Sequence, residues 1–487
     1  MTEIRENKMG VMPIGKLIFT MSIPMIISML VQAVYNVVDS IFVAQFSNVA
    51  LSAVNYSFPA QNLMIGVATG TGVGVNALLS RSLGEKNPAR ANKVAANGVF
   101  LAMVGYFLFL LFGLFGARWF ISFQTPNPEI IEAGYDYLST CCIFSFGIFG
   151  EIMFERLMQA TGRTVYTLFT QGVGAIINII LDPIFIFSEG DSLFGLINMP
   201  FGFGLGAKGA AIATVAGQIV AFMMGIILNH FKNKDIKLRL RNLKPDLKIV
   251  GGIYAIGVPS MIMMCIGSLT TTTVNKILQG FERIGVGIGE TAVNVFGVYF
   301  KLQSFAFMPI FGLNNGVIPI ISYNFGARRR DRVMRTIRLS VTTIICIMLA
   351  ALAVFNLFPQ ILLGFFNANE NMLKIGIPAL KTISLSYIFA GICIGFTSVF
   401  QALGKGIYAT IMSFARQLIA LVPAAYLLSL TDNVDMVWWS YPIAEVISVI
   451  VCAVLFLRLY KKTIKPIDAP IKDLDNDKAE DLAFATK

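Results

Sequence analysis

Charged residues are scarce in this chain. They make up 13% of its 487 residues, which is about half of the ~25% found in soluble globular domains. Hydrophobic residues make up 56%, and the mean hydropathy is +0.73. So little charge excludes a soluble globular enzyme, a nucleic-acid-binding module and a disordered scaffold. The composition is instead that of a polytopic membrane protein.

Histidine is nearly absent, and cysteine is sparse and unpaired in the sequence. The single histidine, His230, closes an apolar run beside a basic segment, so no Ser/His/Asp catalytic set can form. The six cysteines form no CxxC pair, which argues against a zinc site and a disulfide framework. The glycine-rich segment 66–84 lacks the lysine of a phosphate-binding loop, and its small residues favour close helix packing. We therefore predict no enzyme activity and no cofactor.

Long apolar stretches are abundant. A hydrocarbon core of ~30 Å requires about 20 helical residues. The first stretch, 17–43, is too long for a signal-peptide core and is interpreted as a retained span. Twelve stretches qualify, so we predict an all-α polytopic membrane protein with twelve transmembrane helices. They are residues 17–43, 51–80, 94–117, 130–159, 164–187, 207–230, 249–279, 290–319, 336–358, 374–401, 407–430 and 436–457.

Lysine and arginine are divided unequally between the two sides of the predicted membrane. With the N-terminus inside, the inner segments carry 26 of them and the outer segments carry three, Arg118, Arg283 and Lys374. Positive charge gathers on the cytoplasmic side of membrane proteins. We therefore predict a multi-pass protein of the cytoplasmic membrane with both termini in the cytoplasm. The same distribution accounts for the net charge of +11 without a nucleic-acid partner.

The chain repeats itself. SIPMIISMLVQ (22–32), SRSLGEKNPAR (80–90) and QATGRTVY (159–166) in the first half match GVPSMIMMCIG (257–267), SYNFGARRRDR (322–332) and QALGKGIY (401–408) in the second. Six spans per half is an even number, so the two six-helix bundles face the same way in a parallel pseudo-two-fold repeat. Paired bundles of this kind rock around a central cavity and give alternating access.

The repeat also divides the chain into segments. We predict a cytoplasmic N-terminus, an N-terminal six-helix lobe, a cytoplasmic basic linker, a C-terminal six-helix lobe and a disordered cytoplasmic tail. These segments cover residues 1–16, 17–230, 231–248, 249–458 and 459–487, respectively.

Two aspartates at membrane depth are the strongest candidates for a functional site, because a buried charge in the bilayer is costly. Asp39 follows Tyr35 by four residues, and Asp182 follows Asn178 by four, so each pair shares one helix face. Oxygen-rich clusters of this kind suit a proton or Na⁺. The alternative is that both acids only hydrogen-bond helices together. The repeat counterparts of the two acids, Val274 and the region of Val422, are apolar, which favours a specific role for the acids.

Prolines and further acids complete the set of candidates. Pro24 and Pro183 lie within spans and are candidate hinges, because proline removes a helical hydrogen bond. Glu155 lies one turn before Gln159. Two interpretations of Glu155 stay open: a role near the substrate or a proton, and a salt bridge with a basic residue. For the remaining buried or terminal charges we favour structural or helix-end roles; they are Glu151, Glu290, Lys301 and Glu445.

Together these motifs resemble the multidrug and toxic compound extrusion (MATE) family, and most closely its DinF-like bacterial branch. The resemblance covers about residues 10–460 and is carried by SRSLG, YNFGA, QATGR, QALGK and INIILDPIFIF in their order and spacing. It implies a bacterial plasma-membrane antiporter that exports amphipathic or cationic drugs in exchange for H⁺ or Na⁺, with a link to antibiotic resistance. It also implies small organic compounds and the lipid bilayer as partners, and we expect a monomer.

The resemblance also implies a cation site in the N-terminal lobe. The family pattern carries over to Tyr35, Asp39, Asn178, Asp182 and Thr214, of which the last four are the candidate Na⁺ ligands. Glu155 matches an acidic residue on the fourth helix of some relatives. The outer segment 188–206 is longer than the few residues common in such members, which places extra chain near the predicted outer gate.

Three alternatives were considered. A flippase for a lipid-linked oligosaccharide requires a cationic cavity, whereas the candidate intramembrane cations are scattered, at Arg156, Lys276, Lys301 and Arg416. An intramembrane transferase or hydrolase would need a paired histidine, a metal set or a repeated acid motif in its loops, and these are missing from the sequence. A channel is disfavoured because a two-half repeat indicates rocking bundles rather than a symmetric pore.

Overall fold

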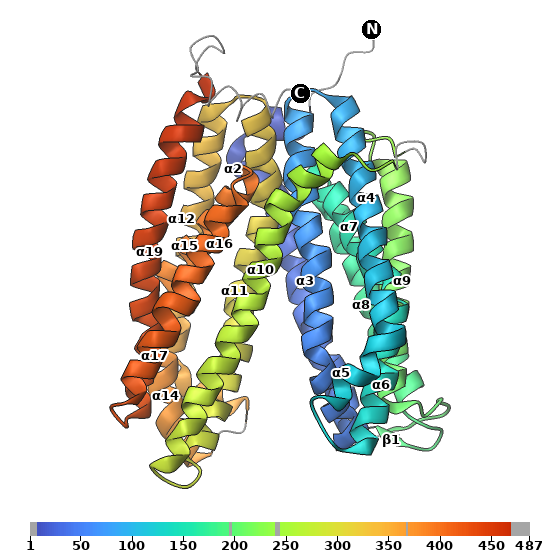
Figure 1. Cartoon of the computed structure of the whole chain (residues 1–487), viewed down its shortest axis with the longest axis vertical. Coiled ribbons are helices and arrows are strands. Elements are labelled where there is room, and N and C mark those ends of the chain that lie inside the picture. The colour runs from blue at the N-terminus through green and yellow to red at the C-terminus, as the bar shows by residue number, and fades with distance from the viewer. Residues whose placement is uncertain (1–6, 194–196, 239–243, 367–368, 469–487) are drawn as a thin grey trace. The chain divides into compact units, whose positions relative to one another are not determined.

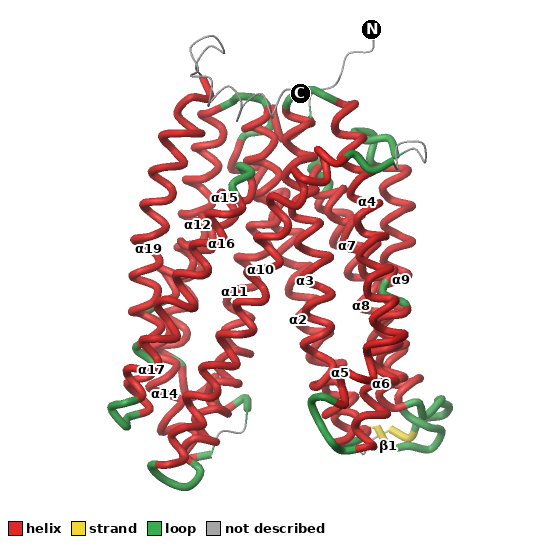
Figure 2. The backbone as a smooth tube through the Cα atoms, viewed as in Figure 1, coloured by secondary structure: helices red, strands yellow, loops and turns green. Residues whose placement is uncertain are grey.

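The computed structural model describes residues 7–193, 197–238, 244–366 and 369–468. Nearly all of this chain is helical (Figure 2), as predicted from the sequence. Ten helices, or helices joined end to end, are long and apolar enough to cross a membrane, and two bent helix pairs raise the number to twelve. Each predicted stretch overlaps one of these spans, which confirms the all-α polytopic fold class.

The six spans of the first half run from α2 to α9 (Figure 1). The fourth is a pair bent by 44°, and the third continues from α4 through a π-helical turn, η1, into α5. The elements are α2 (Ile14–Phe46), α3 (Asn48–Gly84), α4 (Pro88–Leu111), η1 (Phe112–Gly116), α5 (Ala117–Ser122), α6 (Pro128–Ile143), α7 (Phe146–Ala160), α8 (Thr164–Ile186) and α9 (Gly206–Lys232).

The six spans of the second half run from α10 to α19. Here too the fourth span is a bent pair, with an angle of 50°. The elements are α10 (Leu247–Gln279), η3 (Gly280–Arg283), α11 (Ile288–Gly326), α12 (Arg330–Leu357), α13 (Pro359–Gly364), α14 (Glu370–Ser384), α15 (Tyr387–Ala402), α16 (Gly406–Phe414), η4 (Ala415–Leu421), α17 (Val422–Ser429), α18 (Val434–Val437) and α19 (Ser440–Leu459).

The helix boundaries repeat with a fixed offset. The short helices α5 and α13 begin at 117 and 359 and end at 122 and 364, so both ends are 242 residues apart. The same offset separates the ends of α3 and α11, at Gly84 and Gly326. The breaks of the two bent pairs, at 144–145 and 385–386, also differ by about this offset. The sequence repeat is therefore a repeat of helices.

The chain divides into two compact units whose composition differs slightly from the sequence halves. One unit contains residues 23–79 and 87–261, and the other contains residues 1–22, 80–86 and 262–487. The start of α2 and the end of α3 thus belong with the second half, whereas the start of α10 belongs with the first. The first half thus contributes two helix ends to the other unit, and the second half contributes one.

Glycines allow these exchanged helix ends to pack closely. In the 23–79/87–261 unit, a Cβ on Gly70 would lie 2.8 Å from the Gly257 carbonyl oxygen, and a Cβ on Gly257 would lie 2.8 Å from that of Gly70. In the other unit, a Cβ on Gly316 would lie 2.5 Å from Ser22 Oγ. These are small-residue helix contacts, as predicted for the glycine-rich segment 66–84.

The ends of α3 and α11 contact each other in a reciprocal way. A Cβ on Gly84 would lie 2.0 Å from the carbonyl oxygen of Tyr323, and a Cβ on Gly326 would lie 2.2 Å from that of Arg81. Arg81 and Tyr323 occupy equivalent positions, each three residues before its glycine. The motifs SRSLG and SYNFG therefore pack on each other backbone to backbone.

The N-terminal segment is held against the second half. Helix α1 (Lys8–Val11) and the residue after it expose carbonyl groups that accept hydrogen bonds from α11 and α12. Asn324 and Arg332 donate to Met9 O at 3.1 and 2.9 Å, and Arg332 also donates to Met12 O at 2.8 Å. Arg329 donates to Gly10 O at 2.5 Å.

Helical structure continues from α19 into the first part of the predicted tail 459–487. A π-helical turn η5 (Tyr460–Ile464) and a 3-10 turn η6 (Lys465–Asp468) extend α19. Arg328 donates to Ile467 O at 3.1 Å, and Ile467 is buried, which anchors this extension. The rest of the predicted tail lies outside the described residues.

Two connecting segments contain ordered structure. In the outer segment 188–206, strands β1 (Ser192–Leu193) and β2 (Ile197–Asn198) form a short antiparallel hairpin, seen in Figure 2. Met199 and Phe187 on either side of this hairpin are buried in an apolar cluster with α2, α3, α6 and α9. In the predicted linker 231–248, Asp235 pairs with Arg163 at 2.7 Å, and residues 239–243 lie outside the described residues.

Candidate functional site

Three helices of the 23–79/87–261 unit bring the predicted site residues together. Helix α2 carries Tyr35 and Asp39, α8 carries Asn178 and Asp182, and α9 carries Thr214. Helices α8 and α9 approach closely because each has a glycine at the crossing point. A Cβ on Gly217 would lie 2.6 Å from the carbonyl oxygen of Gly174. This crossing lies about one turn from Asn178, and it allows the side chains of the two helices to meet.

Asn178 is the centre of this cluster. Its Nδ2 atom donates to Asp182 Oδ1 at 3.2 Å and is 3.3 Å from Thr214 Oγ1. Asp182 is fully buried and Asn178 is 2% exposed. The predicted Asn178, Asp182 and Thr214 are therefore in direct contact, and the i, i+4 spacing of Asn178 and Asp182 does place them on one face.

The carboxyl groups of Asp39 and Asp182 face each other within hydrogen-bonding range. Two carboxyl groups can share a hydrogen bond only when one of them carries a proton, because two carboxylates have acceptors alone. Among the described residues, Asp39 Oδ1, Asp182 Oδ2 and Asn178 Oδ1 are buried without a donor. The cluster therefore presents acceptor oxygens that a proton or a small cation would satisfy.

Tyr35 lies at the edge of the cluster. It is half-buried, hydrogen-bonds the side chain of Gln32, and interacts electrostatically with both Asp39 and Glu151. The structure thus brings Tyr35 near Asp39, as predicted, but its hydrogen-bond partner is a glutamine on its own helix.

Two neighbours of Asp39 were missed by the sequence reasoning. Tyr137 on α6 interacts with Asp39, and its Oη accepts a hydrogen bond from Gln61 on α3 at 3.3 Å. Gln61 also contacts Cys141 Sγ at 3.3 Å. A single sequence offers little signal for these residues, because neither lies in a distinctive motif and both come from helices without an intramembrane acid in this cluster.

Glu155 forms a separate cluster with α8. Its Oε1 accepts from Thr170 Oγ1 and its Oε2 accepts from Gln171 Nε2, both at 2.9 Å. It is 4% exposed, and the next residue, Arg156, donates to Gln159 at 2.9 Å. The hydrogen-bond donors to Glu155 are neutral side chains, and the adjacent Arg156 interacts with it electrostatically.

Glu151 lies between the two clusters. It is one turn before Glu155, interacts electrostatically with it, and also interacts with Tyr35. The sequence favoured a structural role for this residue. Its position gives it acidic or polar neighbours on both sides within one compact unit.

The candidate site has the chemistry of a site for a proton or Na⁺ rather than for a transition metal. No group of three or more His, Cys, Asp or Glu side chains that could hold a metal occurs in the part of the chain that the structure describes. The oxygens available are those of two carboxyl groups, one amide and one hydroxyl. Hard oxygen ligands suit Na⁺, and the carboxyl pair suits a proton.

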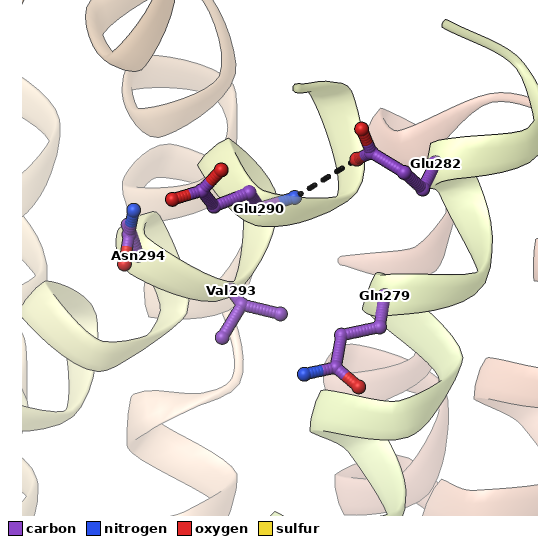
Figure 3. A pocket seen from close by; sticks show the side chains of 5 residues that line it. All are labelled: Gln279, Glu282, Glu290, Val293 and Asn294. Carbon is purple, nitrogen blue, oxygen red and sulfur yellow. Dashed lines mark hydrogen bonds between the residues drawn. The ribbon is translucent and has the colours of Figure 1, made fainter. Parts of the chain in front are cut away.

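A pocket in the other unit has a structural explanation. It has a volume of about 270 Å³ and is lined by Gln279, Glu282, Glu290, Val293 and Asn294 (Figure 3). The Glu282 carboxylate accepts hydrogen bonds from the backbone N–H groups of Gly287, Gly289 and Glu290 at the start of α11. It caps the helix, and Glu290 lies in the first turn, in agreement with the helix-end role predicted for Glu290.

Comparisons with known proteins agree with this fold. The MatE family model matches residues 24–184 and 259–427. The chain is 26% identical to a multidrug export protein MepA of Staphylococcus haemolyticus over 443 residues, which covers 91% of this chain and 92% of that one. It is 25% identical to a MepA of Staphylococcus aureus over 437 residues, covering 89% and 91%.

A solved structure shows the same fold. It is described as the outward-facing conformation of a multidrug resistance MATE family transporter of the MOP superfamily. It superposes with a TM-score of 0.85 at 23% identity, and the match covers 95% of this chain and 99% of that one.

Proposed function

The chain belongs to the MatE family, whose members are transporters and not enzymes, and on this basis we propose that it exports amphipathic or cationic organic compounds by antiport with H⁺ or Na⁺. The names of the MepA relatives support export of several compounds. The coupling ion and the alternating-access cycle are inferred from the site and the helix packing.

The observation that carries this proposal is the facing pair of Asp39 and Asp182. With both carboxyl groups ionised, the pair repels itself in a medium of low dielectric, which increases its affinity for a cation. A proton or Na⁺ removes this repulsion and uses the acceptor oxygens that lack donors, and Na⁺ would take its oxygens from Asp39, Asn178, Asp182 and Thr214. When the cation leaves, the acids are free to interact with a cationic compound.

The inward gradient supplies the driving force. Moving one elementary charge across 100 mV provides about 2.3 kcal/mol, which corresponds to roughly a 50-fold concentration ratio. The cation needs only to bind one conformation more tightly than the other to drive the exchange.

The prolines are suited to act as hinges. Pro24 lies close to the point in α2 where the chain passes from one compact unit to the other, between Ser22 and Ile23. Its repeat counterpart, Pro259, lies close to the same transition in α10, between residues 261 and 262. Proline removes a backbone hydrogen bond and weakens the helix there. Pro183, next to Asp182, is in position to couple cation binding to a bend of α8.

The exchanged helix ends support a gate on the side of the protein where α3 and α11 end. The reciprocal contact of Gly84 and Gly326, and the hydrogen bonds of the N-terminal segment to Asn324 and Arg332, join the first half to the second. Opening that side requires these contacts to separate. We place this side in the cytoplasm of a bacterial cell because the lysines and arginines gather there, and we expect the protein to act as a monomer.

Transport by purified protein in liposomes tests the proposal. Ethidium would be enclosed in the lumen of liposomes in which the orientation of the protein has been determined. A pH or Na⁺ gradient would then be imposed across the membrane. Wild type is expected to move ethidium with one gradient, and Asp39→Asn and Asp182→Asn are expected to abolish this movement. Asp136→Asn is the matched control, because Asp136 is half-exposed and pairs with Lys208 on the same unit.

The outcomes separate the alternatives. Equal transport by the Asp39 and Asp182 variants would contradict coupling by these acids. A lack of ethidium movement under any gradient would favour the flippase alternative. Three of the four cations named for it have other partners: Arg416 pairs with Glu445, Arg156 donates a hydrogen bond to Gln159, and Lys301 lies over the ring of Phe366.

A further inference from the structure

An ion pair between half-buried Arg416 and buried Glu445 lies in the second half of the chain, on helices that repeat two of the three helices of the acid site. Arg416 is in η4, within the eleventh span, and Glu445 is in α19, the twelfth. In the repeat, these spans correspond to α8 and α9, which carry Asp182 and Thr214. Each half therefore has ionisable or polar side chains between its fifth and sixth spans. The first half has one acid there, Asp182, with Asn178 and Thr214, and the second half has an acid and a base.

The contact between Arg416 and Glu445 is incomplete. Arg416 Nη1 lies 3.3 Å from Glu445 Oε1, whereas Glu445 Oε2 is buried without a donor among the described residues. A strong guanidinium–carboxylate pair is bidentate, with N···O distances of ~2.7–2.9 Å. Glu445 is only 8% exposed. A buried pair that leaves an oxygen unsatisfied stabilises a fold poorly compared with apolar side chains, so stability alone does not explain it.

The surroundings of Glu445 contain one charged group. Arg416 approaches it from η4, Tyr299 from α11 and Cys393 from α15, and Cys393 in turn contacts Cys452 of α19. No further charged side chain from α14, α16 or α17 acts on Glu445 in the described part of the chain. Because the tyrosine and the thiols are uncharged at neutral pH, Arg416 alone compensates the carboxylate.

Aromatic rings fill the neighbouring space and leave a further polar atom unpaired. Tyr299 stacks with Phe296, which also packs against Trp438 and Tyr441. Within the described residues, Trp438 Nε1 is buried without a partner, as is Glu445 Oε2. A carboxylate that lost Arg416 here would lie among apolar rings, where the neutral acid is the stable form.

The two partners differ in their freedom to move. The side chain of Arg416 is 24% exposed and that of Glu445 is 10% exposed, so Arg416 has the better access to water. Arg416 also lies in a π-helical turn, whose conversion to α-helix shifts the register of its side chains. The corresponding helix in the first half, α8, is α-helical throughout. Arg416 is therefore the partner that can withdraw.

We propose that Glu445 is a proton-binding site of the second half, and that it takes up a proton when Arg416 withdraws. A proton from water bonds to the carboxylate and converts it to a carboxylic acid, while Arg416 keeps its charge and becomes hydrated. A metal cation fits this site less well than a proton, because the site consists of a single carboxylate and a nearby positively charged guanidinium. Proton binding stands by itself; its use in transport rests on the proposed antiport.

Infrared spectroscopy tests proton binding without transport. Purified full-length protein in lipid nanodiscs would be titrated with pH, and the C=O stretch of protonated carboxylic acids would be followed. Glu445→Gln is expected to lose one titrating band that the Asp39→Asn/Asp182→Asn double variant keeps. Arg416→Gln is expected to move the midpoint of this band to higher pH, because the proton then binds without competition from the guanidinium. Exposed Glu290→Gln is the matched control and keeps the band.

The proposal is overturned if Glu445→Gln leaves every titrating band in place, or if Arg416→Gln leaves the midpoint unchanged. If Glu445→Gln does not fold, Glu445→Asp keeps the test: it is expected to retain a titrating band at a shifted frequency, and an unshifted set of bands contradicts the assignment. Failure of wild-type ethidium transport would overturn the antiport proposal, but the infrared result would still test proton binding by Glu445. In a transport-active protein, Glu445→Gln is expected to lower the number of protons exchanged per ethidium, and an unchanged number contradicts the use of this site in transport.

Discussion

Gly326→Ala tests whether the reciprocal contact of α3 and α11 holds one side of the protein closed. The new Cβ would lie 2.2 Å from Arg81 O, and atoms of the same backbone, Arg81 C and Cα, follow at 3.0 and 3.2 Å. A backbone carbonyl cannot rotate away as a flexible side chain can, so the two helix ends must separate. Overpacking of this kind costs about 1–3 kcal/mol, and a bias of this size shifts an equilibrium between two states about 5–150-fold.

The accessibility of an engineered cysteine reports this shift. Ser22→Cys, in a background without the six native cysteines, places a thiol at a position that is 1% exposed and packed against Gly316. Its alkylation by a membrane-impermeant maleimide is expected to be faster in Gly326→Ala by about the same 5–150-fold, because only the separated state exposes it.

A matched glycine substitution provides the control. Gly15 lies in α2, the helix that carries Ser22, and a Cβ on Gly15 would have no atom within 4 Å. The alkylation rate of Gly15→Ala is therefore expected to stay unchanged. Complete labelling in denaturant verifies that both variants carry the thiol. If Gly326→Ala and Gly15→Ala give the same rate in the folded protein, the contact of the two glycine motifs is not a gate and the reasoning is refuted.

Three further variants test the first-half site. Asn178→Ala removes the donor to Asp182 and the contact to Thr214, and is expected to reduce gradient-driven ethidium exchange with a loss of about 1–3 kcal/mol in cation binding; unchanged exchange contradicts the role of this amide. Glu155→Gln is expected to lower the melting temperature, since a neutral amide is a weaker acceptor for its hydroxyl and amide donors on α8; an unaltered melting temperature argues against this hydrogen-bonded role. Gly217→Ala, whose Cβ would lie 2.6 Å from Gly174 O, is expected to lower both stability and transport, whereas the open Gly172→Ala has no such effect; equal behaviour of the two glycine variants contradicts the α8–α9 crossing as the support of the site.

The sequence was sufficient for the helices and for the main members of the acid site. Spans are predictable because each must be apolar over a length set by the bilayer, and the spacing of Asn178 and Asp182 follows from helical geometry. The facing of Asp39 and Asp182 needed the structure or the family resemblance, because periodicity within one helix says nothing of which face meets another helix.

The contacts between helices from different parts of the chain were not predictable in the same way. The motifs around Gly84 and Gly326 were visible as repeats, yet their reciprocal packing depends on which helix ends are exchanged between the compact units. Glu445 was interpreted as having a structural or helix-end role, and its contact with Arg416, 29 residues away on another span, leaves no local pattern in the sequence. Tyr137 and Gln61 escaped notice because polar side chains near an acid from another helix leave no local pattern.

The release of protons on ethidium binding is the most direct test of the claim that Asp39 and Asp182 exchange a cation for an exported compound. Purified protein in weakly buffered solution would be mixed with ethidium while the pH is followed, in the presence and absence of Na⁺. Wild type is expected to release protons, or to lose bound Na⁺ when that is the coupling ion, and the Asp39→Asn/Asp182→Asn variant is expected to release neither. Ethidium binding to wild type with no displacement of either ion, or equal displacement by the double variant, would contradict the account.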